Sequence, residues 1–177
     1  KARIGRALRK EGIEQVRSTH VIRYLDPYLP TYWETRSLHD GLSEYFESIA
    51  ENAAWYSCFD VYGHLDYILR YAPDGTRDYR YEDYRDIADL ALHNLVYAGK
   101  GIEINTSGLR SLPYPHPKKE LLIRYRELGG EIITIGSDAH TPDLLGFEFR
   151  KAEVYLKECG FHYYTIFRGR KPVMERL

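Results

Sequence analysis

Short β-branched segments alternate with helical patterns along this chain, and that alternation restricts the fold more than any other feature. Residues 131–135 read Glu-Ile-Ile-Thr-Ile, which is typical of a buried strand. Similar strands are predicted at 13–22, 58–63, 101–105 and 161–167. Because strands that alternate with helices form parallel sheets, the sequence predicts an α/β fold in which β-α repeats four times before a final strand.

Amphipathic segments lie between these strands. Ser37 is a predicted N-cap because Asp40 follows three residues later, and Thr141 is a second predicted N-cap, followed by Pro142 in the first turn. The predicted helices cover about 37–53, 82–98, 118–128 and 142–159. The side chains expected to face the core are Leu42, Tyr45, Phe46, Ile49, Ala53, Ile87, Leu90, Ala91, Leu95, Ala98, Leu121, Leu122, Tyr125, Leu128, Leu145, Phe149, Ala152 and Leu156. Residues 1–11 are basic and weakly helical.

Composition excludes several classes of protein. The 177 residues fit one domain, and a net charge of −1 does not predict a nucleic-acid-binding surface. No apolar run approaches the ~20 residues of a membrane span. The two cysteines, Cys58 and Cys159, lack metal-type spacing, so a reducing cytoplasm is the expected location. Because the chain begins with Lys1, we expect it to be a processed or truncated piece.

Polar side chains follow the predicted strands at the places where those strands end. Right-handed crossovers bring these ends to one face, which would gather the side chains of His20, His64, Arg110, Asp138 and His140. Imidazole and carboxylate suit zinc, manganese or iron, and such a metal lowers the pKa of bound water. A guanidinium matches a phosphate, so this set favours hydrolysis of a phosphate ester.

Two of these groups also have simpler interpretations. Asp138 and His140 are two residues apart, so in an extended backbone their side chains would point to the same side. They either bind a metal or form a turn closed by a hydrogen bond between them. Arg110 either contacts phosphate or is an ordinary solvated arginine at a loop tip.

Three segments in order resemble histidinol-phosphatases of the PHP (polymerase and histidinol phosphatase) superfamily. They are residues 59–66 (FDVYGHLD), 103–110 (EINTSGLR) and 136–140 (GSDAH). The resemblance extends over roughly residues 13–177. Residues 18–20 are similar to the family's Gly-Ser-Val-His strand tip, although Arg17 takes the place of the glycine.

This resemblance implies the C-terminal part of a distorted (β/α)7 barrel of TIM type, with a trinuclear site for divalent metals. It implies hydrolysis of L-histidinol phosphate, a small phosphate monoester, to L-histidinol and phosphate in histidine biosynthesis. At matching positions His20, His64, Asp138 and His140 would be metal ligands. Arg110 would be a phosphate contact.

Neighbouring residues keep two interpretations each. Asp66 either orients a metal ligand from behind or caps the following helix. Glu103 and Asn105 either line the pocket, where they would meet the substrate's ammonium, or are buried hydrogen-bonding groups. The aromatic residues that either cover the substrate's imidazole or pack in the core are Tyr24, Tyr28, Tyr32 and Trp33. The histidines expected to be structural or exposed are His39, His93, His162 and, in a surface loop, His116.

The family's opening His-x-His tip does not precede His20, and residues 1–12 do not resemble it. We therefore expect residues 1–177 to form one PHP-type domain that is incomplete at its N-terminus. An open strand edge would then favour a complementing N-terminal half or association between copies. The alternatives are another PHP phosphoesterase and a catalytically incomplete subunit. No nucleic acid or membrane is expected as a partner.

Overall fold

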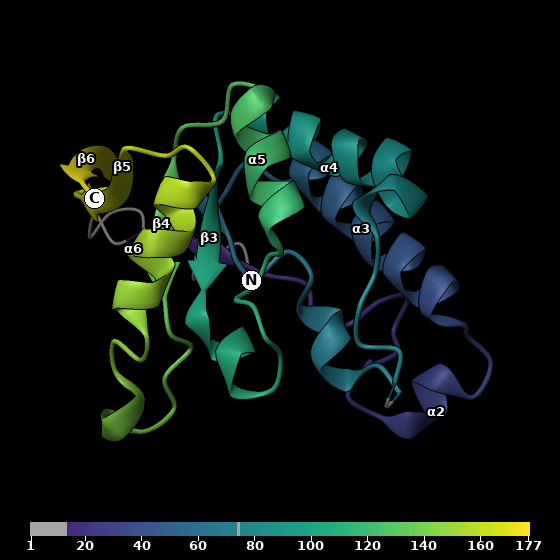
Figure 1. Cartoon of the computed structure of the whole chain (residues 1–177). Helices are drawn as coiled ribbons and strands as arrows, with labels where there is room; N and C mark the ends of the chain where they lie inside the picture. The colour runs from purple at the N-terminus through teal and green to yellow at the C-terminus, as the bar shows by residue number, and fades with distance from the viewer. Residues whose placement is uncertain (1–13, 74) are drawn as a thin grey trace.

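A parallel sheet forms the centre of the molecule (Figure 1). The computed structural model describes residues 14–73 and 75–177, so the prediction for residues 1–11 lies outside the described residues. Within the described residues this sheet has the order β1-β2-β3-β4. Its strands are β1 (Val16–Arg17), β2 (Val61–Tyr62), β3 (Gly101–Asn105) and β4 (Ile133–Gly136). All three pairings are parallel, which confirms the predicted mixed α/β fold.

Helices connect and cover these strands. The elements are α2 (Pro30–Trp33), α3 (Leu38–Trp55), η1 (Tyr67–Tyr71), η2 (Tyr81–Tyr84), α4 (Arg85–Tyr97), η3 (Thr106–Arg110), α5 (Lys119–Glu127), η4 (Pro142–Leu144) and α6 (Phe149–Glu158). Helices α3, α4 and α5 form a row in which each packs on the next, and α6 packs on β4 (Figure 1). Among the described residues, no helix is long and apolar enough to cross a membrane.

Helix α3 forms as its sequence predicts. The Ser37 side chain accepts a hydrogen bond from the Asp40 amide, and the Asp40 carboxylate accepts one from the Ser37 amide. This capping box satisfies amides that would otherwise lack a partner in the first turn. The predicted core face of the helix is buried: Leu42, Tyr45, Phe46, Ile49 and Ala53.

Helix α4 buries Ala91 and Leu95 as predicted, but the rest of its core face differs from the prediction. Leu90 is 49% exposed, although it was expected inside. Ala98 is exposed beyond the end of the helix. The buried stripe is Ala88, Ala91, Leu92 and Leu95, which has the i, i+3, i+4, i+7 spacing of a single face. The helix lies between α3 and α5, and small alanines on this stripe suit a close approach to those neighbours. For α5 the predicted Leu121, Leu122 and Tyr125 are buried.

The segment expected to be one helix from 142 to 159 is divided in two. The short η4 ends at Leu144, and α6 begins only at Phe149. Gly146 and Glu148 have φ angles of 69° and 53°, a left-handed conformation that interrupts a right-handed helix. Leu145, expected in the core, is therefore 74% exposed in the connection. The Thr141 side chain makes no capping hydrogen bond.

The final strand does not join the parallel sheet as predicted. Strand β5 (Tyr163–Arg168) pairs antiparallel with β6 (Lys171–Arg176), a strand that was not predicted. Gly169 and Arg170 form the two-residue turn, with φ angles of 57° and 61°. Positive φ at both central positions is typical of a type I′ hairpin turn, and the glycine at 169 is the signal that predicts it.

The hairpin turn is tied to the start of β2 by a partly buried ion pair. The Arg170 guanidinium donates two hydrogen bonds to the Asp60 carboxylate, of which Nε to Oδ2 measures 2.8 Å. The Gln15 amide donates to the same Oδ2 at 2.9 Å. Asp60 therefore joins the hairpin, β2 and the residue before β1 at the end of the sheet opposite to the strand tips.

We expect Arg170→Met to lower the free energy of unfolding by about 1–3 kcal/mol, because Asp60 would remain desolvated without its cation. The two side chains are only 15% and 13% exposed. Urea unfolding measures the change. The matched control is Arg168→Met, because Arg168 is 72% exposed and 3.9 Å from Glu175. Equal losses of unfolding free energy in the two variants would show that the buried Arg170–Asp60 pair contributes no more to stability than the exposed Arg168.

Candidate active site at the carboxyl ends of the parallel strands

One buried tyrosine holds the two loops that carry the first candidate ligands. The Tyr45 hydroxyl, on α3, lies 3.3 Å from the carbonyl oxygen of Thr19 and 3.2 Å from that of His64. It is the donor to both, because a carbonyl oxygen only accepts. The rings of His20 and His64 consequently lie with centroids 5.1 Å apart. The structure thus brings together two histidines that are 44 residues apart in sequence.

One nitrogen of the buried His64 imidazole is free to bind a ligand such as a metal ion. It is 6% exposed, and its Nδ1 has no hydrogen-bond partner among the described residues. Burial, together with the nearby His20 and His116, lowers the pKa of His64 from 6.5 to about 3. The imidazole is therefore neutral at pH 7, the form that binds metals. A buried nitrogen without a hydrogen-bond partner lowers the stability of the folded protein unless a water or a ligand satisfies it.

Asp66 is a fully buried carboxylate with three donors around it. It accepts hydrogen bonds from His116 Nδ1 at 2.6 Å, the Lys118 amide at 2.8 Å and the Tyr79 hydroxyl at 3.2 Å. Its side chain does not cap η1, so the capping interpretation is wrong. Asp66 instead joins three separate loops beneath the strand tips.

His116 is the clearest residue that sequence reasoning misplaced. Expected in a surface loop, it is completely buried and exchanges two backbone hydrogen bonds with Asn105, at 2.6 and 2.9 Å. Its Nε2 has no partner among the described residues, and neither has the Ser107 hydroxyl. The prolines on both sides suggested an exposed turn, and nothing in the local sequence shows the buried Asp66 that binds it.

Glu103 lies between the tips of β2 and β4. Its carboxylate fills the space that a Cβ on Gly136 would occupy, and a Cβ on Gly63 would also approach it closely, at 3.1 Å. Burial raises the pKa of Glu103, and the Asp138 carboxylate raises it further, so a cation here would relieve both effects. Asn105 is engaged inside the protein, because it donates to Glu103 and accepts from the Ser107 amide.

Two arginines from different strand tips meet at the tip of β4. Arg110, at the end of η3, donates to the carbonyl oxygen of Ser137 at 2.7 Å. Arg70, in η1, lies 3.8 Å from the Asp138 carboxylate and 3.4 Å from the carbonyl oxygen of Ser107. The sequence analysis names Arg110 as a candidate phosphate contact and does not name Arg70. The available signal was its position six residues after His64, in the same strand-tip segment.

The extended backbone expected from Asp138 to His140 is absent, because Asp138 has a φ of 48°. The side chains still lie near each other, with His140 Nδ1 4.0 Å from Asp138 Oδ1. The same Nδ1 is 2.9 Å from the carbonyl oxygen of Asp138, to which it can only donate. That arrangement leaves His140 Nε2 as an acceptor on a side chain that is 78% exposed.

The donors at this edge fit a divalent metal in chemical kind. They are imidazoles and carboxylates, and His64 Nδ1 is a buried nitrogen without a hydrogen-bond partner among the described residues, which a metal would satisfy. Within residues 14–73 and 75–177, however, no three side chains of His, Cys, Asp or Glu converge closely enough to hold a metal ion. The described part of the chain therefore presents these donors at separate positions around the strand tips, without a complete set of metal ligands.

Comparison with known proteins identifies the class to which this fold and site belong. The PHP domain family model matches residues 7–107. The chain therefore belongs to the PHP domain family, which confirms the resemblance inferred from its motifs.

Particular relatives are histidinol-phosphatases. The histidinol-phosphatase of Lactococcus lactis is 32% identical over 146 residues, covering 76% of this chain and 54% of the relative. A probable histidinol-phosphatase of Thermotoga maritima is 36% identical over 119 residues, covering 67% of this chain and 48% of the relative. The chain thus spans about half the length of these curated relatives.

A solved structure is also similar. It is the crystal structure of histidinol phosphate phosphatase from Lactococcus lactis in complex with zinc, L-histidinol and phosphate. The TM-score is 0.80 at 25% sequence identity, and the match covers 98% of this chain and 66% of that one. The similarity extends to the fold of nearly the whole chain.

The pKa of His64 predicts how the metal-free protein responds to acid. Its folded value, about 3, is below the ordinary 6.5, so the unfolded chain takes up this proton first. We expect the stability contributed by neutral His64 to be complete above pH 6.5 and to fall by ~1.4 kcal/mol per pH unit between 6.5 and 3. Urea unfolding of chelator-treated protein across this range measures it. His64→Gln should flatten the slope, and His93→Gln, an exposed histidine, should not.

Asp66→Ala should cost about 2–5 kcal/mol of unfolding free energy, because three buried donors would lose their acceptor. Thermal and urea unfolding both measure this loss. The control Asp86→Ala changes an exposed carboxylate in the first turn of α4 and should cost less than about 1 kcal/mol. A loss of unfolding free energy no greater than that of the control would mean that water accepts hydrogen bonds from the three donors once the Asp66 carboxylate is removed.

Proposed function

We propose that this chain is the C-terminal part of a metal-dependent phosphatase that hydrolyses L-histidinol phosphate to L-histidinol and phosphate. The observation that carries the proposal is the meeting of Arg70 and Arg110 at the tip of β4, beside the neutral, orphaned His64. Two guanidiniums at one tip suit a phosphate, and an orphaned imidazole suits a metal. The relatives named histidinol-phosphatase, and a similar structure that contains zinc, L-histidinol and phosphate, support the same substrate.

We propose that His20, His64, Asp138 and His140 hold divalent metal in a multinuclear site, with zinc, manganese or iron as candidates. When bound, such a metal activates water at neutral pH and neutralises charge on the phosphate. The similar zinc-containing structure and the neutral state of His64 support zinc as the first choice. Asp66 would support the site without binding metal itself, because it accepts a hydrogen bond from His116 Nδ1 and so fixes the orientation of that imidazole.

The chain's own residues would bind and orient the substrate. Arg70 and Arg110 would each give up a contact to a backbone carbonyl oxygen, that of Ser107 and that of Ser137, to bind the phosphate oxygens. The Glu103 carboxylate, which lies between Gly63 and Gly136, would line the substrate pocket at this edge of the sheet. Asn105 would keep the Glu103 carboxylate in place through its 2.9 Å hydrogen bond.

We propose that residues 1–177 belong to one PHP-type domain whose complete form is a distorted (β/α)7 barrel. The parallel order of β1 to β4 and the coverage of 66% of the similar structure support this. A complementing N-terminal half, or a second copy, would then pair with β1, which is an edge strand of the sheet within the described residues. Histidine biosynthesis in the cytoplasm is the proposed setting, and the absence of disulfides at Cys58 and Cys159 agrees with a reducing compartment.

The test uses the complete natural polypeptide that carries this sequence, reloaded with zinc, manganese or iron after chelation. We expect phosphate release from L-histidinol phosphate, with bound metal counted by elemental analysis. Arg70→Met and Arg110→Met should each lower kcat/KM by about a hundredfold, because each removes a charge-assisted contact to phosphate. His140→Ala should lower both activity and metal content.

Arg168→Met is the control, because that arginine is exposed on the β5–β6 hairpin and should leave kcat/KM unchanged. Metal uptake with activity only on p-nitrophenyl phosphate would favour another PHP phosphoesterase. A protein that takes up no metal and releases no phosphate would be a non-catalytic subunit.

A further inference from the structure

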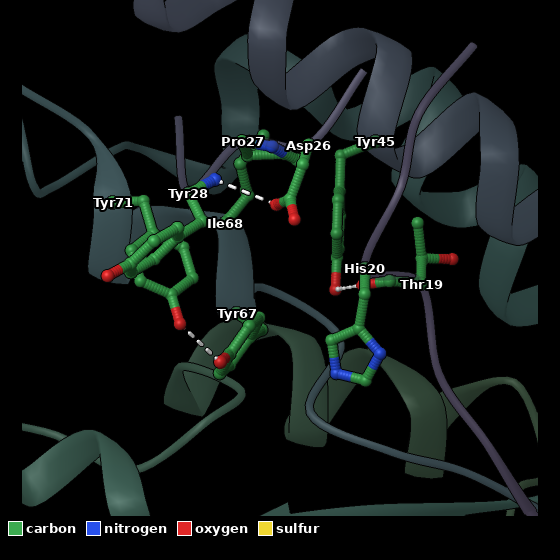
Figure 2. A pocket seen from close by; sticks show the side chains of 9 residues that line it. All are labelled: Thr19, His20, Asp26, Pro27, Tyr28, Tyr45, Tyr67, Ile68 and Tyr71. Carbon is green, nitrogen blue, oxygen red and sulfur yellow. Dashed lines mark hydrogen bonds between the residues drawn. The ribbon is translucent and has the colours of Figure 1, made fainter. Parts of the chain in front are cut away.

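Beside His20 lies an aromatic hollow that contains a carboxylate, that of Asp26, for which residues 14–73 and 75–177 provide no cationic partner. Its volume is about 250 Å³. The residues that line it are Thr19, His20, Asp26, Pro27, Tyr28, Tyr45, Tyr67, Ile68 and Tyr71. Figure 2 shows the Asp26 carboxylate directed into the space that these rings surround. None of these residues except His20 belongs to the ligand set described above.

Asp26 is held in place and still has capacity to bind. Its Oδ1 accepts the Tyr28 amide at 2.9 Å, which fixes the carboxylate within the loop. Among the described residues, no Lys, Arg or His pairs with it. A half-buried carboxylate beside tyrosine rings, with one oxygen uncommitted, is a site for an organic cation.

The tyrosines around Asp26 form a continuous wall. Tyr28 meets Tyr71 edge-on at 5.2 Å between centroids, and the Tyr71 and Tyr67 hydroxyls are hydrogen-bonded at 2.6 Å (Figure 2). Their rings give an apolar surface with polar rims, which suits a heterocycle or a short carbon chain. At ~30 Å³ per water, the cavity has room for roughly eight waters, or an organic group of about ten heavy atoms.

Tyr67 connects this hollow to the candidate phosphate site. Its ring lies 5.4 Å from that of His20 on the hollow side and 4.3 Å from that of His64. The Arg70 guanidinium lies over the same ring at 5.3 Å. Tyr67 thus borders both the hollow that contains Asp26 and the Arg70 guanidinium at the β4 tip. The two ends complement a molecule with a cation at one end and a phosphate at the other.

We propose that Asp26 binds the ammonium group of the substrate, with Tyr28, Tyr67 and Tyr71 enclosing its organic part, so that this hollow selects phosphate monoesters that carry an amine. This inference rests on the proposed phosphatase function. It assigns selectivity to the loop that follows His20 and leaves the phosphate to Arg70 and Arg110. Asp26 is in this assignment a specificity residue that contacts the amine and takes no part in phosphate transfer.

The experiment compares two substrates and two proteins, using the complete, metal-loaded polypeptide. The substrates are L-histidinol phosphate and its analogue without the amine, 3-(imidazol-4-yl)propyl phosphate. In Asp26→Asn the Tyr28 amide keeps an acceptor, so the loop is preserved. We expect this variant to lose about tenfold to a hundredfold in kcat/KM for L-histidinol phosphate, mainly through KM, and to change little with the analogue.

Asp86→Asn on α4 is the matched control and should leave both substrates unaffected. Equal losses with both substrates, or no loss with either, would overturn the assignment of Asp26 to the amine. Binding of L-histidinol, measured by calorimetry, provides a readout without catalysis and should weaken about tenfold in Asp26→Asn. If neither phosphate ester is hydrolysed but L-histidinol still binds through Asp26, the phosphatase function fails and the cation site stands. If wild type hydrolyses the ester without dependence on Asp26, only the cation site fails.

Discussion

The burial of the Asp66 carboxylate is the constraint on which the candidate site, at the carboxyl ends of the parallel strands, depends. A charge taken out of water must be matched by donors, and here they come from Tyr79, His116 and Lys118. Tyr79 lies 13 residues from Asp66, and His116 and Lys118 lie in one segment 50 and 52 residues from it, so satisfying this carboxylate brings the loop of Asp66 together with two others. The Tyr45 hydroxyl does the same for the loops of His20 and His64. The positions of the candidate ligands follow from these buried polar contacts.

The edge where these loops meet has an uneven distribution of charge. Neutral His64 and the buried Glu103 are groups that would gain from a nearby cation. Arg70 and Arg110 bring positive charge to the tip of β4, and Asp26, which pairs with no cation of the described part of the chain, brings a carboxylate to the hollow beside Tyr67. Such separation suits a substrate that carries both signs of charge, and it supports the proposed phosphatase function through physical complementarity. The chain belongs to the PHP domain family, and the similar solved structure is that of a histidinol phosphate phosphatase that contains zinc.

Much of the fold could be predicted because local patterns and tertiary contacts agree. Strand β3 has the predicted bounds, and the Ser37 capping box forms as its spacing indicates. Predictions failed where backbone conformation or neighbours decided the outcome. Glu148 in the left-handed region divides the helix expected after Thr141, and Leu90 turns outward because α4 packs along its alanine stripe. The turn at Gly169 lets β6 pair antiparallel with β5, so the predicted last strand belongs to a hairpin and not to the parallel sheet.

The sequence by itself determined the parallel α/β plan and which residue types stand at the strand tips, because hydrophobic period and turn residues are local properties. Its motifs also determined the family, since residues 59–66, 103–110 and 136–140 occur in order. Only the tertiary structure decided that His116 is buried on Asp66, that Arg70 joins Arg110, and that Asp26 faces an aromatic hollow. These are contacts between residues distant in the chain. They depend on how the strands place their loops, and no local pattern encodes that placement.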